Sequence, residues 1–319
     1  MRMMMSSGSP TRPIIIAHFS TFAVFALTLV TSPQLAFVAA PERTLVTPRQ
    51  LTFVTAPQFR SGVNVVEVYA AVVDRTGAPV TGLSRNDFTV LEDGTPQSIS
   101  TFAEGDFPLS VAIAIDRSFS MKTQLPGALG AARTFLGELR PRDQAMIVAI
   151  GSEIETVAPL GNDRDAELNA LAALQPWGTT GLHDAIIRSI DAIQSASGRR
   201  ALVLLSDGTD RYSEASADAA LDRARQSDVM IYPVAVGRTR PPLFAELAAL
   251  TGGRSFQPRD PAQLTTTMKG IASELAHQYL LGYTPSRPIA AGDQQWRAIT
   301  VRVNRADVTV RARDGYLVR

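Results

Sequence analysis

Five oxygen-bearing side chains stand where an apolar segment ends or a new segment begins, and together they could bind a metal ion. Asp116 ends an apolar run and is followed at intervals of two residues by Ser118 and Ser120. Asp207 follows a second apolar run, and Thr180 lies between the two in a glycine-bounded loop. Open α/β sheets bind ligands at the carboxyl ends of their strands, so these side chains are predicted to meet at one sheet edge.

The chemistry of this set favours a hard divalent cation. Two carboxylates and three hydroxyl groups are oxygen donors of the kind that Mg²⁺ prefers. Asp116 and Asp207 formally balance the charge of the ion, so its remaining position should attract an anionic ligand. Mn²⁺ is expected to substitute, whereas the larger Ca²⁺ fits short hydroxyl distances less well. The sequence has no cysteine and three widely separated histidines, which excludes sites built on thiolate ligands or on a histidine motif.

In this order and spacing, the motifs resemble those of the von Willebrand factor A family. The pattern is D-x-S-x-S after the first strand, a Thr before a helix bearing L-x-D-A, and an Asp after a later apolar strand. Thr180 matches better than Thr179, because it stands four residues before Asp184. The flanking segments D-F-x-V-x-E-D-G (87–94) and Y-x-L-G-Y (279–283) also resemble bacterial proteins that contain this domain.

The resemblance implies a metal-ion-dependent adhesion site that holds Mg²⁺ and binds an Asp or Glu carboxylate of a partner protein. Its metal ligands would be Asp116, Ser118, Ser120, Thr180 and Asp207. The family also implies that ligand binding can move the last helix, here about residues 261–275.

Residues beside these ligands are expected to shape the site. Arg117 and Phe119 occupy positions that are commonly small in the family, so they are predicted to crowd the rim and to affect ligand choice. Phe119 is expected to add an apolar contact with a ligand, and Arg117 a second pairing of charges. Trp177 either lines the rim or packs beneath the loop. Asp184 is expected to fix its loop by hydrogen bonding, and Asp210 either supports the site as an acceptor or lies in a solvated turn.

The pattern of elements predicts an α/β fold with a doubly wound, Rossmann-like sheet in residues 107–275. Apolar runs alternate there with segments of helical spacing, as in an open sheet covered on both faces, and one edge strand of the mostly parallel sheet is expected to be antiparallel. Residues 61–106 and 276–319 instead read as short alternating strands. Neither set suffices for a core of its own, so the two are predicted to form one small antiparallel β-sandwich around the inserted α/β domain. Asp93-Gly94 predicts a hairpin whose returning strand is residues 98–102, and no helix is expected between residues 63 and 102. Within the α/β region, a further short strand is expected near Ser255.

The amino-terminal segment predicts export. Residues 1–40 have the charged, apolar and small-residue order of a signal peptide, although an uncleaved anchor is an alternative. Residues 41–60 are rich in Pro and Thr and read as a linker. The predicted location is the periplasm, the cell surface or the medium, with the inner membrane as an alternative. A formal net charge of +1 gives no basic field for nucleic acid.

Three functions are compatible with these motifs. The first is a non-enzymatic binding module for adhesion or scaffolding. The second is a metal-dependent hydrolase, against which stands the lack of a convincing base, because His183 is expected to pack on its helix. The sequence also contains no G-x-S-x-G, Walker A or G-x-G-x-x-G motif. The third is a structural envelope protein whose site is vestigial.

Overall fold

The computed structural model describes residues 65–105, 107–289 and 294–318. The predicted signal segment (1–40) and linker (41–60) lie outside these ranges. Within the described ranges, no helix combines the length and the apolar character needed to cross a membrane.

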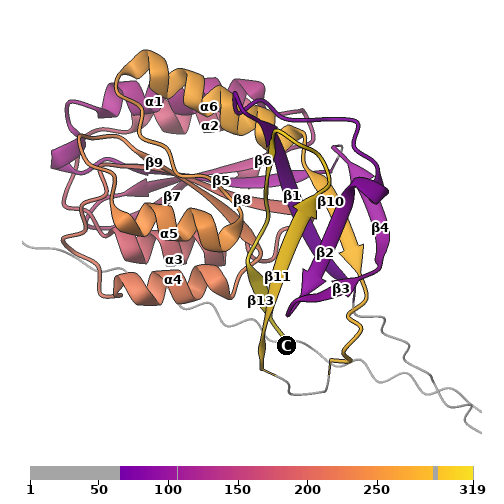
Figure 1. Ribbon diagram of the computed structural model, residues 1–319. Helices are drawn as coiled ribbons and strands as arrows, with labels where there is room; N and C mark the ends of the chain where they lie inside the picture. Colours follow the sequence, from indigo (N-terminus) through magenta and orange to yellow (C-terminus); the bar gives the residue numbers. More distant parts are fainter. Residues whose placement is uncertain (1–64, 106, 290–293, 319) are drawn as a thin grey trace, which may run out of the picture. The chain divides into compact units, whose positions relative to one another are not determined.

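A five-stranded sheet forms the centre of the α/β region (Figure 1). Its inner strands consist almost entirely of buried residues, which explains their continuous apolar runs. Four strands are parallel, and the edge strand β7 runs antiparallel to β6, as the sequence predicts. In spatial order the strands are β7 (Ile154–Gly161), β6 (Gln144–Ile150), β5 (Leu109–Asp116), β8 (Arg199–Ser206) and β9 (Val229–Ala235).

Six helices cover the two faces of this sheet (Figure 1). Along β5, alternate side chains point to opposite faces, so Val111 and Ile113 join one apolar cluster while Ala112 and Ala114 join the other. The first cluster includes α1 (Leu125–Glu138), α2 (Arg164–Ala173) and α6 (Pro261–Ala276). The second cluster includes α3 (Leu182–Ile193), α4 (Ala217–Arg225) and α5 (Pro242–Thr251).

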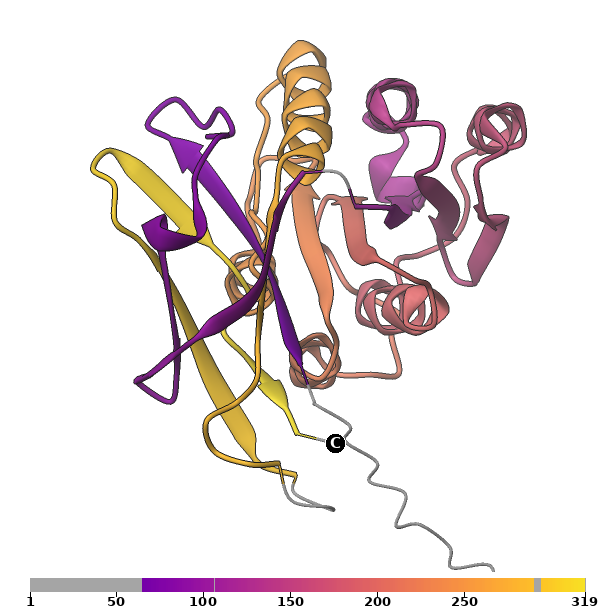
Figure 2. The same cartoon turned by 90° about the vertical axis from the view of Figure 1, so that its right-hand side faces the viewer.

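Segments from before and after the α/β region form two four-stranded antiparallel sheets, seen as purple and yellow strands in Figure 2. One buried apolar cluster draws on both sheets and includes Val68, Val90, Leu281 and Ile299. The first sheet has the order β12 (Val308–Arg311), β1 (Val66–Asp74), β10 (Tyr279–Tyr283) and β4 (Ile99–Glu104). The second has the order β13 (Gly315–Leu317), β11 (Trp296–Val303), β2 (Phe88–Glu92) and β3 (Thr95–Gln97).

Local details differ from the sequence predictions in three places. The hairpin at Asp93-Gly94 forms with positive φ at both residues, but the returning strand is β3, whereas the segment from Ile99 onward crosses to the other sheet. A 3₁₀ turn, η1 (Arg85–Asp87), lies where no helix is expected. The strand expected near Ser255 is a single bridge between Phe256 and Val234.

The α/β region begins and ends beside paired strands. β4 leads into β5, and α6 leads into β10, the antiparallel neighbour of β4. The two connections are joined where the amide of Gly105 donates to the carbonyl of Gln278 at 2.9 Å. The last turn of α6 is also held by its side chains, because buried Glu274 accepts hydrogen bonds from Tyr232 on β9 and Arg311 on β12.

Candidate metal centre

Asp116 is the last residue of β5, and its side chain is fully buried at the carboxyl end of the sheet. One carboxylate oxygen accepts the backbone N–H of Ser118 at 2.9 Å, and the other accepts the hydroxyl of Ser206 at 2.7 Å. The hydroxyl of Thr180 lies 3.5 Å from the second oxygen. All three donors are uncharged, so the hydrogen bonds orient the carboxylate without neutralising it.

The loop after β5 places two serine hydroxyls next to this carboxylate. Ser118 is buried and Ser120 is exposed, and their Oγ atoms lie 3.1 Å apart. Between them begins a 3₁₀ turn, η2 (Phe119–Met121), whose Met121 side chain is fully buried in the core. Burial of Met121 anchors the loop, so that the short turn holds Ser118 and Ser120 side by side.

The second loop brings Thr180 to the site and keeps Thr179 away from it. Gly178 has a positive φ of 75°, and its carbonyl accepts the amide of Phe119 at 3.1 Å, which ties this loop to the first. Thr180 is buried beside Asp116, whereas the hydroxyl of exposed Thr179 pairs with Ser152 at 3.2 Å. Of these two threonines, it is therefore Thr180, the one predicted from the sequence, that lies next to Asp116.

Asp207 follows β8 and forms a tight turn at the same edge of the sheet. One oxygen of its carboxylate accepts the amide of Thr209 at 2.9 Å. The next residue, Gly208, has a φ of 82°, and a Cβ atom there would lie 1.9 Å from the ring of Pro241. The turn consequently requires glycine. Among the described residues, no hydrogen bond links the Asp207 carboxylate to the other four predicted ligands, although its charge acts on Asp116.

Ser206 is a site residue that the sequence analysis did not assign. It is fully buried, donates its hydroxyl to Asp116, and accepts the amide of Gly208 at 3.0 Å. The sequence feature that could have indicated Ser206 is its position: it is a polar residue at the end of an otherwise apolar strand, directly before Asp207.

The described residues do not balance the negative charge of Asp116 with a positive one. Burial raises the pKa of the Asp116 carboxyl and the charge of Asp207 raises it further, whereas hydrogen bonds from Ser118 and Ser206 lower it. In the described part of the chain, no Lys, Arg or His forms an ion pair with Asp116. Burying a carboxylate without a compensating charge is costly. The residues present therefore fit a hard divalent cation, which would supply the missing charge.

The rest of the donor set is consistent with such an ion but not with a softer one. Nowhere in the described ranges do three or more Asp, Glu, His or Cys residues gather as a metal-binding group. Two carboxylates and neutral hydroxyl groups are the donors at this edge of the sheet, which suits an ion that keeps part of its water shell.

Arg117 does not project freely from the rim. Its guanidinium pairs with Glu155 at 3.0 Å and lies 5.1 Å from the centre of the Trp177 ring. The sequence suggests Arg117 as a second charged contact for a ligand, but an intramolecular partner already engages this charge. By contrast, Phe119 is 65% exposed and Trp177 is 39% exposed, so both present aromatic surface at the rim.

Two further aspartates fix the loops around the site. Asp184 accepts the amides of Glu214 and Ala215, at 2.9 and 3.0 Å, which is the loop-fixing role expected for it. Asp210 accepts the amide of Leu182 at 2.7 Å and the hydroxyl of Ser213 at 2.6 Å. The partly buried side chain of Asp210 therefore caps the amino terminus of α3 and connects it to the loop before α4.

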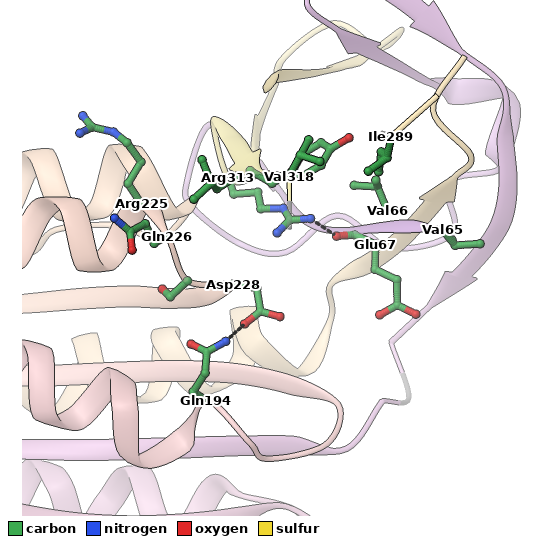
Figure 3. A pocket seen from close by; sticks show the side chains of 13 residues that line it. Val65, Val66, Glu67, Gln194, Arg225, Gln226, Asp228, Ile289, Arg313 and Val318 are labelled. Carbon is green, nitrogen blue, oxygen red and sulfur yellow. Dashed lines mark hydrogen bonds between the residues drawn. The ribbon is translucent and has the colours of Figure 1, made fainter. Parts of the chain in front are cut away.

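One cavity of about 380 Å³ lies away from these loops, and its lining is shown in Figure 3. Gln194 donates to Asp228 there at 3.4 Å, and Arg313 donates to the carbonyl of Glu67 at 2.8 Å. None of the predicted site residues lines it. One of its acidic residues, Asp228, is already paired with Arg200, so this cavity is not a second candidate for the metal.

Comparison with known proteins gives a match in the middle of the chain. A family model described as the von Willebrand factor type A domain matches residues 111–209, the segment that holds all five predicted ligands. Curated proteins give no significant match.

Several solved structures are similar at low sequence identity. A von Willebrand factor type A protein from Catenulispora acidiphila has 16% identity and a TM-score of 0.47, with 74% of each chain covered. The von Willebrand factor domain of a type V pilus tip protein from Porphyromonas gingivalis has 14% identity and a TM-score of 0.44, covering 52% of this chain and 94% of that one. An aerotolerance-related membrane protein from Bacteroides fragilis has 19% identity and a TM-score of 0.44, covering 53% and 98%. Residues 111–209 are thus similar in sequence to von Willebrand factor type A domains, and they lie in a sheet with the strand and helix alternation that this resemblance implies.

Proposed function

We propose that this protein is a non-enzymatic binding module that holds one Mg²⁺ and uses it to bind an Asp or Glu side chain of a partner protein. The metal ligands would be Asp116, Ser118, Ser120, Thr180 and Asp207. The observation that carries the proposal is the buried carboxylate of Asp116, which has oriented neutral donors around it and, among the described residues, no cationic side chain paired with it.

The electrostatics explain why the ligand should be anionic. Mg²⁺ together with the charges of Asp116 and Asp207 sums to zero, and the remaining donors are neutral. Because the ligands do not give the site a net negative charge, the ion still attracts a further carboxylate. This attraction is stronger at a site that is partly shielded from water. When bound, the metal supplies this attraction, and the loops of the protein supply the orientation.

The rim favours a protein over a small molecule as the partner. Four large apolar side chains are prominently exposed in the described residues, and three of them belong to loops at this edge: Phe119, Trp177 and Tyr212. Exposed aromatic residues around a polar centre are typical of protein-binding surfaces. Tyr212, which is 61% exposed, extends the rim beyond the residues that the sequence indicates.

Hydrolysis is disfavoured by the position of the nearby imidazole. The Nδ1 atom of His183 lies 3.1 Å from the carbonyl of Ala215 and 3.7 Å from the carboxylate of Asp210, so the ring is engaged in fixing α3 and its neighbouring loop. A general base must reach the proton that it removes. A binding role needs no such base and uses every residue described at the site.

We also propose that the protein is exported and that the two antiparallel sheets act as one β-sandwich module. The order of charged, apolar and small residues in 1–40 supports export, and the cluster shared by both sheets supports the module. Cell fractionation of the full chain tests the first idea; detection only in the cytoplasm would refute it. Limited proteolysis tests the second, because separate release of the two terminal segments would contradict a shared module.

Calorimetric titration of Mg²⁺ into the full chain tests the metal site. We expect saturable binding that is lost in Asp116→Ala and retained in Asp163→Ala. Asp163 is a suitable control because it caps α2, where it accepts the amide of Ala166, and is not part of the site. Absence of heat at millimolar Mg²⁺ would instead identify a vestigial site. Turnover of ester, peptide or phosphate substrates that disappears in Asp116→Ala would favour the hydrolase.

A further inference from the structure

Exposed arginines gather on one side of the candidate metal centre. Arg238 and Arg240 lie in the loop after β9, and Arg259 lies just before α6; we call these three the basic flank. All three side chains are exposed, and none forms an ion pair with another described residue. Cationic side chains without an ion-pair partner among the described residues are available to a ligand.

The basic flank borders a cavity of about 300 Å³ with an apolar floor. Arg238 and Arg259 line this cavity together with Val236 and Leu264. Asp260 also lines it, but one oxygen of its carboxylate accepts the amide of Gln263 at 2.8 Å as the cap of α6. The cavity therefore offers two arginines and a partly engaged aspartate to an incoming side chain.

This cavity directly adjoins a proposed metal ligand. Gly237 lines it, and a Cβ atom at Gly237 would lie 3.4 Å from the Cβ atom of Asp207. The amide of Val236 donates to the carbonyl of Ser206 at 2.8 Å, which fixes the two loops together. A ligand carboxylate on the metal and a second side chain in the cavity can thus belong to the same short segment.

The opposite side of the site is acidic. Another cavity, of about 360 Å³, is lined by Glu153 in the turn between β6 and β7, by Glu155 in β7 and by Glu214 before α4; we call these three the acidic flank. Arg188 lines the same cavity, and Glu155 is paired with Arg117. Glu153 and Glu214 are exposed, and within the described ranges neither forms an ion pair.

The strand order sets the distance between the flanks. Arg238 and Arg240 of the basic flank follow β9, and Glu153 of the acidic flank follows β6, with β5 and β8 between these two strands. Three strand spacings correspond to about 14 Å. An extended peptide rises about 3.3 Å per residue, so about four residues cross this edge of the sheet.

We infer that the partner contributes an extended peptide that lies across the carboxyl ends of the strands with its charges in a fixed order. One carboxylate binds the metal, a second acidic side chain enters the cavity of the basic flank, and a Lys or Arg faces the acidic flank. This inference rests on the proposed function and adds the sequence class of the ligand. Complementary charges at a rim act mainly on specificity and association rate.

Labelled synthetic peptides provide the probe, with binding measured by fluorescence anisotropy in Mg²⁺. The reference peptide has one central Glu among Ser and Gly residues. A second peptide adds an Asp two residues to one side, a third adds a Lys on the other side, and a fourth carries both. Each charged peptide is also made with the order reversed, because the direction of the bound chain is open.

We expect the peptide with both charges, in one of its two orders, to bind about three- to tenfold more tightly than the reference peptide. Arg238→Ser/Arg259→Ser should lose the gain from Asp and keep the gain from Lys, whereas Glu153→Gln/Glu214→Gln should do the opposite. Arg85→Ser/Arg305→Ser is the matched control, because it removes two exposed arginines from the antiparallel sheets.

The outcomes separate this inference from the proposed function. If Mg²⁺ and the reference peptide bind but the added charges have no effect, the inference fails and the proposed function stands. If the control variant loses the same affinity as Arg238→Ser/Arg259→Ser, the effect is one of net charge, and the inference also fails. If no peptide binds in a Mg²⁺-dependent way, both are refuted.

Discussion

Glu92 and Asp116 are both buried carboxylates, yet the protein surrounds them in different ways. Glu92 is 3% exposed in the antiparallel sheets and pairs with buried Arg297 at 3.0 Å. It also accepts the hydroxyls of Tyr283 and Tyr316, each at 2.8 Å. Asp116 accepts hydrogen bonds of similar length, but all of its donors are neutral. The difference shows that the fold compensates one buried carboxylate with an arginine and surrounds the other with neutral donors, which is the arrangement that the proposed metal site requires.

Other buried carboxylates follow the pattern of Glu92. Glu167 pairs with Arg164 at 2.7 Å, and Glu274 pairs with Arg311. The charge of Asp143, which accepts the amide of Leu109, favours the cationic form of Arg199. Among the buried carboxylates of the described residues, Asp116 therefore stands apart because no arginine forms an ion pair with it; its neighbour Arg117 pairs with Glu155 instead.

The largest effect is expected when Glu92 loses the arginine that pairs with it. Arg297→Met should lower the free energy of unfolding by about 3–5 kcal/mol, because Glu92 is then left as a buried, unpaired charge. Urea denaturation should give the same loss with Mg²⁺ and with chelator. A second change, Glu92→Leu, should recover much of the stability. An unchanged midpoint in Arg297→Met would mean that the pair is not needed to compensate Glu92.

Asp116→Asn tests the uncompensated carboxylate and should give a smaller effect that depends on metal. In chelator, the free energy of unfolding should stay the same or rise, since the change removes a buried charge and keeps a hydrogen-bonding side chain. When Mg²⁺ is present at a hundred times its dissociation constant, the unsubstituted protein should gain about 2.7 kcal/mol and the variant none. Equal gains in both proteins would place the metal elsewhere.

The smallest effect concerns a neutral partner of Glu92. Burial and the hydrogen bond to Glu92 raise the pKa of Tyr316 from 10.0 to about 12. The unfolded chain then loses this proton at lower pH than the folded protein. The contribution of Tyr316 to the free energy of unfolding is therefore fully present below pH 10 and is lost as the pH rises toward 12. Tyr316→Phe should make this fall shallower in denaturation curves at several pH values. A slope identical to that of the unsubstituted protein would contradict the raised pKa.

Local patterns sufficed for much of the α/β region and for the loops of the candidate site. The apolar runs that end at Asp116 and Ser206 could be recognised because buried parallel strands have few polar residues. The preference for Thr180 over Thr179 came from the spacing to Asp184 in the family that the sequence resembles, and Thr180 is the one that lies beside Asp116. The antiparallel edge strand β7 was also predictable, since a short connection cannot join parallel neighbours.

Interactions between distant parts of the chain could not be predicted in the same way. Glu92 and Arg297 are separated by 205 positions, and no local pattern indicates that they pair. The pairing of Arg117 with Glu155 and the capping of α3 by Asp210 depend on how loops cross at the edge of the sheet. Ser206 was missed because a serine beside an aspartate usually indicates a turn.

The single hydrogen bond between Gly105 and Gln278 has a consequence for how this architecture can be modified. The chain enters and leaves the α/β region through neighbouring strands, so the ends of that region are separated by no more than the width of a hairpin. A short turn could therefore connect β4 directly to β10 and leave the antiparallel ladder intact. By the same geometry, we expect that another compact domain whose termini lie side by side would fit at this point without disturbing the pairing of β4 with β10.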